Sequence, residues 1–155
     1  MYKRQALPVY LLDCVTFWVS NLIFAGGDLG GTDPGSDFNY NKSLLTAHQE
    51  EAAAGRVRRA VDELLAALAQ ANATLIAVSN EVGLGVVPEY PLARLYRDQL
   101  GWVNQRLASE ADRAYFLVAG LPLDLTSLST SSASVLPRSV ARECGAAPFP
   151  REEKP

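Results

Sequence analysis

Lysine, histidine and cysteine are scarce in this sequence of 155 residues, and their scarcity limits its chemistry. The two cysteines, Cys14 and Cys144, lie far apart, so the sequence indicates neither a disulfide framework nor a metal-binding knuckle. The one histidine, His48, stands in a different sequence context from Cys14. We therefore expect Cys14 to be a small buried side chain rather than a nucleophile, and His48 to lie on the surface.

The sequence also lacks a strong charge of either sign and a long apolar run. The formal net charge is -3, so binding to nucleic acid or to an anionic membrane through bulk electrostatics is disfavoured. No apolar stretch approaches the ~20 residues that a membrane-spanning helix needs, and no signal-peptide cleavage site follows the start. With 48% hydrophobic and 20% charged residues, the chain is expected to be a cytoplasmic globular protein with one core.

A phosphate-binding loop of the form Gly-x-x-x-x-Gly-Lys-Ser/Thr is absent from the 155 residues. The only lysines are Lys3, Lys42 and Lys154. Lys42 is followed by serine, but Asn41 rather than glycine precedes it, and it comes after the first predicted strand rather than before it. The backbone amides and the lysine that carry phosphate charge in a P-loop are therefore missing from this sequence.

Three short apolar runs have the length and composition of buried parallel strands. They are residues 8–13, 74–79 and 114–119. Between these runs, apolar residues recur with helical spacing. The expected helices cover residues 15–24, residues 43–71 with a bend near Gly55, and a segment that begins at Pro91. Strands that alternate with helical crossovers predict an α/β fold, with a largely parallel sheet and helices on both faces.

Two segments have the composition of irregular chain. Residues 26–40 are dominated by Gly, Asp, Thr, Pro, Ser and Asn, which predicts a long loop. After Leu125 the composition shifts sharply to Ser, Thr, Pro and Ala. We therefore expect one domain over residues 1–125 and a disordered tail over residues 126–155.

Polar residues collect where the predicted strands end. Asp13 and Thr16 follow the first strand, Asn80 and Glu81 follow the second, and Gly120 follows the third. In open parallel sheets, ligands bind beyond the carboxyl ends of the strands. A hydrophobic strand that ends in aspartate is also typical of a Walker B segment, whose carboxylate binds magnesium. Many buried strands end in aspartate only to cap the next helix, and on the pattern alone capping is the stronger interpretation of Asp13.

Three stretches of the sequence resemble the adenosylcobinamide kinase/guanylyltransferase family. The first is Leu-Leu-Asp-Cys-Val-Thr-Phe-Trp-Val-Ser-Asn-Leu at 11–22, and the last is Ala-Gly-Leu-Pro at 119–122. The most specific is the Asn-Glu-Val-Gly block, which runs from Val78 to Glu89 and continues through Leu92-Ala93-Arg94, Arg97-Asp98, Gly101 and Asn104-Gln105. Together the matches span residues 8–125.

The resemblance implies a RecA-like P-loop NTPase-type fold, from which the P-loop strand is missing here, and assembly as a homotrimer. It also implies a role in cobalamin biosynthesis. Such enzymes phosphorylate adenosylcobinamide with ATP or GTP, and then transfer GMP from GTP to adenosylcobinamide phosphate through a guanylylated histidine. The implied ligands are adenosylcobinamide, GTP or ATP, and Mg²⁺ in the complete enzyme.

The resemblance also suggests roles for individual residues. Asp13 matches the acidic, metal-linked position and Thr16 a nucleotide-contacting threonine. The remaining matches are Asn80, Glu81, Gly83 and Gly85 in the loop near the substrate, and Arg94 and Arg97 on the next helix. We take Asp13 and Glu81 as the catalytic candidates. For Glu81, a strand-end carboxylate that pairs with Arg94 or Arg97 is an equally open interpretation.

In the family, the P-loop and the guanylylated histidine both precede the acidic strand. Neither is present here, and His48 is not the equivalent residue. Three hypotheses remain: a family enzyme whose upstream part is missing, a non-catalytic paralogue that binds family subunits or a corrinoid, and a partner chain that supplies the P-loop strand in trans. We prefer the first because the Asn-Glu-Val-Gly block is intact, and we expect the chain alone to be inactive. Without the P-loop strand we also expect uncovered strands and aggregation.

Overall fold

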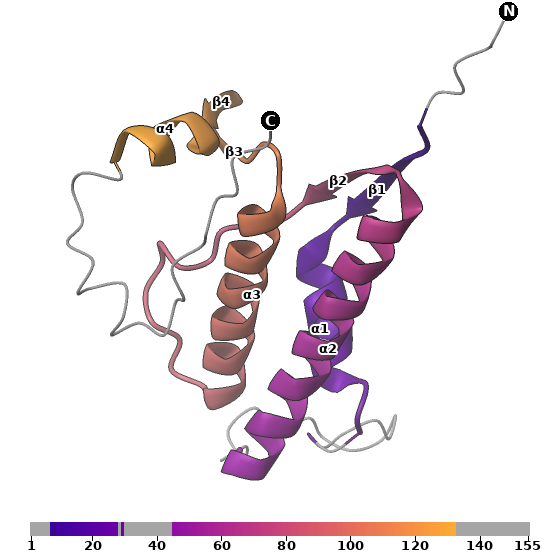
Figure 1. The fold of residues 1–155 in the computed structure, drawn as a ribbon. Helices are drawn as coiled ribbons and strands as arrows, with labels where there is room; N and C mark the ends of the chain where they lie inside the picture. Colours follow the sequence, from indigo (N-terminus) through magenta and orange to yellow (C-terminus); the bar gives the residue numbers. More distant parts are fainter. Residues whose placement is uncertain (1–6, 28, 30–44, 133–155) are drawn as a thin grey trace, which may run out of the picture. The chain divides into compact units, whose positions relative to one another are not determined.

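The computed structural model describes residues 7–27, residue 29 and residues 45–132 (Figure 1). Most of the predicted loop over residues 26–40, and the predicted tail from residue 133 onward, lie outside these residues. The chain divides into two compact units, Met1–Leu107 and Ala108–Pro155.

The first unit combines two strands with three helices. Its elements are β1 (Val9–Asp13), α1 (Val15–Phe24), α2 (Ala47–Ala71), β2 (Thr74–Val78) and most of α3 (Pro91–Glu110). β1 and β2 pair in parallel, with Val9 opposite Thr74 and Asp13 opposite Val78. The prediction of an α/β fold with parallel strands and helical crossovers is thus confirmed for this pair.

One cluster of buried side chains joins the three helices. Its members recur at helical spacing, so each helix turns one apolar stripe toward the others. The cluster consists of Val15, Val19 and Ile23 from α1, Ala53, Val57 and Val61 from α2, and Leu95, Leu100 and Val103 from α3. Figure 1 shows α2 and α3 as two long helices, with α1 beside α2. The helical periodicity of the sequence therefore predicts the core correctly.

Helix α2 begins later than the sequence pattern suggests, because of a capping box at its start. The Thr46 hydroxyl accepts a hydrogen bond from the Gln49 backbone amide at 3.2 Å, and the Gln49 side chain accepts one from the Thr46 amide at 2.9 Å. These two bonds satisfy amides that lack partners within a helix. At its other end, Asn72 adopts a left-handed conformation with φ of 43° and terminates the helix.

The second unit contains a hairpin that the sequence pattern does not predict. β3 (Tyr115–Val118) pairs antiparallel with β4 (Leu121–Asp124), whereas residues 114–119 are predicted as a third parallel strand. The reason is the two-residue turn between them, where Ala119 and Gly120 both have positive φ, 51° and 77°. Such a turn matches the twist of two antiparallel strands and pairs them locally.

Helix α4 (Leu125–Ser132) occupies the start of the segment whose composition predicts a tail. A carboxylate at its start explains the difference. One Asp124 oxygen accepts hydrogen bonds from the backbone amides of Thr126 at 3.0 Å and Ser127 at 3.2 Å. An acceptor at this position stabilises the first helical turn, which Ser and Thr residues by themselves favour only weakly.

One face of the β1–β2 sheet is uncovered. Side chains alternate along a strand, so Val9 and Leu11 share this face with Ile76 and Val78. All four are exposed, Leu11 to 65% and Val9 to 62%. The exposure agrees with the expectation of uncovered strands. Helices on both faces of the sheet are not found in the described part of the chain, where they cover only the side that carries Leu12. Contiguous exposed apolar surface of this kind favours association.

A basic residue of α2 holds the end of α1. The guanidinium of Arg56 donates to the carbonyl oxygens of Leu22 at 3.1 Å and Ile23 at 2.7 Å. Carbonyls in the last turn of a helix lack intrahelical donors, so this contact satisfies two of them. Alternating charges such as those of α2 are typical of a solvated helix face, but Arg56 is partly buried against α1.

We predict that the chain self-associates through the uncovered sheet face. Leu11 lies directly opposite Ile76, so the double variant Leu11→Lys/Ile76→Glu places opposite charges side by side and removes apolar surface. Concentration-dependent light scattering and binding of an apolar dye should both fall. The control is Leu117→Lys in the other unit, which is also 65% exposed. Association that is equal in both variants would contradict the prediction.

We also predict that Arg56→Ala lowers the free energy of unfolding by about 1–3 kcal/mol, because two partly buried carbonyls lose a charged donor. Arg58→Ala is the matched control: Arg58 lies two residues away and makes an exposed ion pair with Glu51 at 3.3 Å. Loss of such a pair changes stability by about 0–1 kcal/mol. Urea unfolding followed by circular dichroism measures the free energy of unfolding of both variants. Equal losses would show that the contact of Arg56 with α1 stabilises the fold no more than an exposed ion pair does.

Candidate functional site

The parallel pairing brings two of the predicted polar clusters to the same edge of the sheet. Asp13 is the last residue of β1 and lies opposite Val78, the last residue of β2. Ser79, Asn80 and Glu81 follow β2 directly. Carboxyl ends of parallel strands are the common ligand-binding edge of α/β sheets. Gly120, the third predicted member, instead lies in the hairpin turn of the second unit.

Asp13 and Thr16 stand at the junction between β1 and α1. Asp13 is exposed, and its carboxylate has no hydrogen-bond or ion-pair partner among the described residues. It does not cap the helix, because the N-cap is Cys14, whose side chain makes no capping hydrogen bond. The hydroxyl oxygen of Thr16 is buried and also has no partner in the described part of the chain. The Asp13 carboxylate is thus accessible to a ligand, whereas the Thr16 oxygen is enclosed.

Tyr96 of α3 packs behind this junction. Its hydroxyl donates to the Thr16 carbonyl oxygen at 3.4 Å. Burial raises the pKa of the Tyr96 hydroxyl above the ordinary value of 10.0, and the neighbouring thiol of Cys14 adds to the effect. The phenol therefore stays protonated and remains a donor, which ties α3 to the first turn of α1.

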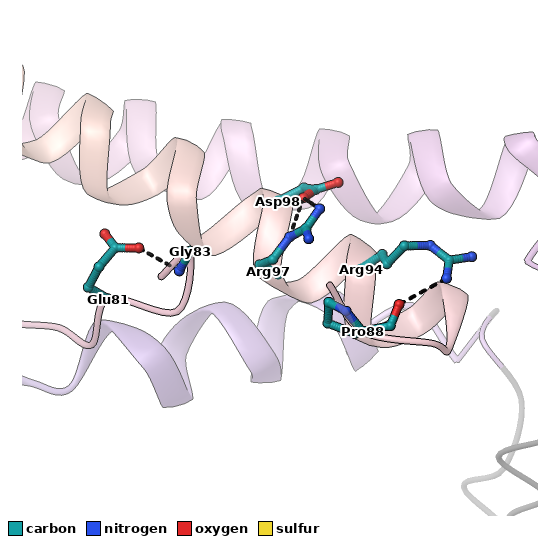
Figure 2. Close-up of polar contacts among 6 residues, drawn as sticks. All are labelled: Glu81, Gly83, Pro88, Arg94, Arg97 and Asp98. Atoms are coloured by element: carbon teal, nitrogen blue, oxygen red, sulfur yellow. Dashed lines mark hydrogen bonds and ion pairs between the residues drawn. The ribbon is translucent and has the colours of Figure 1, made fainter. Parts of the chain in front are cut away.

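We name residues 79–90, between β2 and α3, the motif loop. Its main internal contact is a hydrogen bond of 2.6 Å from the Gly83 amide to a Glu81 carboxylate oxygen (Figure 2). Glu81 therefore pairs with neither Arg94 nor Arg97, contrary to the ion pair that the sequence left open. The contact closes a tight turn and keeps the Glu81 carboxylate beside the backbone of Gly83.

The two arginines of α3 have different partners. Arg94 reaches back to the end of the motif loop and donates to the Pro88 carbonyl oxygen at 3.0 Å. Arg97 pairs with Asp98, with its Nη2 atom 2.7 Å from a carboxylate oxygen (Figure 2). The positive charge of each group is therefore partly engaged within the chain, and neither guanidinium contacts Glu81.

Between the motif loop and α3 lies an open depression of about 380 Å³. Glu81 and Gly83 line one side, and Arg97, Trp102 and Asn104 line the other. An aromatic ring, amides and opposite charges suit a ligand with apolar and hydrogen-bonding parts. Among the described residues, no group of three or more His, Cys, Asp or Glu side chains is placed to hold a metal ion. None of the helices in that part of the chain has the length and hydropathy to cross a membrane.

Asn104 is the residue of this site that residue-by-residue interpretation missed. It falls within the Asn-Glu-Val-Gly block, but its position on α3, almost four turns along the helix from the loop, gives no sign of its role. In the structure, its side-chain oxygen accepts from the Ser79 hydroxyl at 2.6 Å, and its nitrogen donates to the Asn80 carbonyl at 3.0 Å. The usable signal was the Ser-Asn pair at a strand end, which requires polar partners.

We predict that Gly83→Ala displaces the Glu81 carboxylate. A Cβ atom at position 83 would lie 2.8 Å from a Glu81 oxygen, so this flexible side chain must move and lose its hydrogen bond. Exchange of the amide at position 83, relative to its intrinsic rate, should rise about fivefold, the factor that corresponds to about 1 kcal/mol. Global stability should change by less than about 0.5 kcal/mol.

The matched control for this prediction is Gly85→Ala, whose added methyl group meets no atom within 4 Å. It should leave exchange of the Gly83 amide unchanged. If both variants accelerate that amide equally, the steric account of Gly83 is wrong.

Comparison with known proteins matches this chain to one family. The model of the family described as cobinamide kinase / cobinamide phosphate guanyltransferase matches residues 1–125. A protein named bifunctional adenosylcobalamin biosynthesis protein CobU, from Salmonella typhimurium, is 39% identical over 115 residues, which are 72% of this chain and 54% of that protein. Its namesake from Escherichia coli is 37% identical over 113 residues, 73% of this chain and 55% of that protein.

A third relative is the bifunctional adenosylcobalamin biosynthesis protein CobP from Pseudomonas aeruginosa. It is 35% identical over 123 residues, which are 79% of this chain and 56% of that protein. The chain therefore spans about half the length of the curated relatives it matches. The matched region includes both β1 and the motif loop. The chain belongs to the cobinamide kinase / cobinamide phosphate guanyltransferase family.

Proposed function

We propose that this chain supplies part of the site that phosphorylates adenosylcobinamide and transfers GMP from GTP to the phosphorylated product. Family membership supports the reaction class. The observation that carries the proposal is the common edge of β1 and β2, where Asp13 and the motif loop both emerge. Ligands of open parallel sheets bind at this edge.

In this proposal, Asp13 supplies a carboxylate for a nucleotide-bound Mg²⁺. Mg²⁺ is commonly held by one or two protein carboxylates together with phosphate oxygens, so a single exposed aspartate fits the role. When bound, the ion neutralises phosphate charge. Thr16 follows in the first turn of α1, and its hydroxyl can donate and accept a hydrogen bond. Because its oxygen is buried, the first turn of α1 has to open before the hydroxyl contacts the nucleotide.

The motif loop faces the other substrate in this scheme. Glu81, Asn80, Gly83 and Gly85 form its first half, and Arg97 lies across the depression from Glu81. The mixture of a carboxylate, amides and an aromatic ring suits a large ligand with amide side chains better than a polyphosphate. We assign cobinamide to this side, with Glu81 as its catalytic contact. By resemblance to the family, the working assembly is a homotrimer.

The 155 residues contain no Gly-x-x-x-x-Gly-Lys-Ser/Thr segment, and this decides the expected activity of the chain by itself. Without a lysine and a cluster of backbone amides, the charge of a triphosphate is not compensated at the reaction centre. We therefore propose that these residues alone bind the corrinoid substrate without turning over nucleotide. A non-catalytic paralogue that binds a corrinoid is the second candidate, and it rests on the same missing segment.

We predict that the purified chain binds cobinamide but forms no cobinamide phosphate with ATP or GTP. Calorimetry measures the binding, and mass spectrometry detects the product, with a full-length CobU as the positive control. Glu81→Gln should weaken binding about tenfold, because a charged hydrogen-bond acceptor contributes about 1.5 kcal/mol or more. Glu89→Gln is the control, since Glu89 is exposed and does not line the depression.

Two outcomes would contradict the proposal. Detectable cobinamide phosphate from the pure chain would show that the missing lysine and glycines are not required. Absence of cobinamide binding, in a chain whose circular dichroism shows a folded protein, would remove the corrinoid from this site.

A further inference from the structure

The motif loop is attached to α3 at both of its ends, and in its first half Val82 packs against the buried cluster. Leu84 and Val86, in the middle of the loop, are 80% and 96% exposed. Their side chains therefore contribute no packing that would fix the backbone. The position of Glu81 therefore depends on the packing of its neighbour Val82 and on the polar contacts that hold the ends of the loop.

The first attachment is a two-part contact from Asn104. Its amide oxygen accepts from the Ser79 hydroxyl at 2.6 Å, and its amide nitrogen donates to the Asn80 carbonyl at 3.0 Å. An asparagine side chain offers one acceptor and one donor group, and this contact uses both. Aspartate would keep only the first part, and alanine would keep neither. The side chain thus fixes the two residues that precede Glu81.

The second attachment is Arg94, whose guanidinium donates to the carbonyl oxygens of Pro88 at 3.0 Å and Glu89 at 2.5 Å. Arg94 and Asn104 lie ten residues apart on α3, about 15 Å along a helix that rises 1.5 Å per residue. One rigid helix therefore spaces the two ends of the loop.

We propose that Asn104 is the positioning residue of the motif loop: it fixes the main chain at Asn80 and thereby aims the Glu81 carboxylate into the depression beside α3. Asn104 itself lines that depression. The hold on the loop follows from the contacts above. Only the identity of the ligand that meets Glu81 rests on the proposed function.

Loss of a positioning residue changes the mobility of the motif loop, whereas loss of a general stabilising residue lowers the stability of the whole fold. Ser79 and Asn80 are exposed and Asn104 lies at the rim of the depression, so the contact buries little surface. Its removal releases the loop and leaves the buried cluster of α1, α2 and α3 intact. The order of the Gly83 amide, which hydrogen-bonds to Glu81, reports the release directly.

The test compares Asn104→Ala with Gln105→Ala, an exposed neighbour on the same helix. In the unaltered chain we expect the Gly83 amide to have the order parameter of a rigid backbone, ~0.85. In Asn104→Ala it should fall below ~0.6, while the midpoint of thermal unfolding shifts by less than about 4 °C. Gln105→Ala should change neither quantity.

Two further variants separate the parts of the contact. Ser79→Ala removes only the hydroxyl, so the bond to the Asn80 carbonyl should keep the Gly83 amide ordered. Asn104→Asp keeps an acceptor for the Ser79 hydroxyl but loses the donor to Asn80, so it should loosen the loop as alanine does. The double variant Ser79→Ala/Asn104→Ala should be no more mobile than Asn104→Ala alone, because both changes remove the same contact.

An unchanged Gly83 order parameter in folded Asn104→Ala would overturn the proposal. So would a loss of order spread equally over α1, α2 and α3, since that result marks a general structural role. Neither readout requires a ligand. Failure of cobinamide to bind the unaltered chain would therefore count against the proposed function and not against this role of Asn104.

Discussion

The parallel pairing of β1 with β2 is the constraint on which the rest of the site depends. Its register sets Asp13 opposite Val78, so that the two strands end at the same edge of the sheet. A shift of one residue would turn Leu12 away from the helices and move it to the uncovered face. The burial of Leu12 against the helical cluster therefore fixes the register, and the register fixes where the polar residues emerge.

Much of the first unit follows from the sequence alone. Helical periodicity predicts α1, α2 and α3 and their buried stripes, because these helices owe their stability to one shared cluster. The apolar runs predict β1 and β2. Partners for single polar groups do not follow from periodicity: Arg56 has the pattern of a solvated residue, yet it satisfies carbonyls of α1. Such contacts depend on how two helices cross, which no local pattern encodes.

In the second unit and in the motif loop, too, local sequence patterns do not predict which groups pair with one another. Ala119 and Gly120 form a turn that imposes antiparallel pairing, whereas composition alone predicts a buried parallel strand. In the motif loop, the sequence singles out Glu81 as a candidate and leaves open whether it pairs with an arginine. The structure pairs it with a backbone amide two residues away, because Arg94 and Arg97 are engaged elsewhere.

Because Arg94 and Arg97 have partners within the chain, little unpaired positive charge lies near the carboxylates of the site. Asp13 and Glu81 place negative charge near the edge of the sheet, and the Arg97 guanidinium is already paired with Asp98. A triphosphate brought to this edge would meet carboxylates before it met an unpaired cation, and at short range such repulsion is costly. In the proposed function, nucleotide binding at this edge therefore requires compensation by a metal ion at Asp13 and by basic groups other than those of the motif loop and α3. In the proposed function the motif loop takes the corrinoid, for whose amide groups a carboxylate fixed by a backbone amide is an acceptor of defined direction.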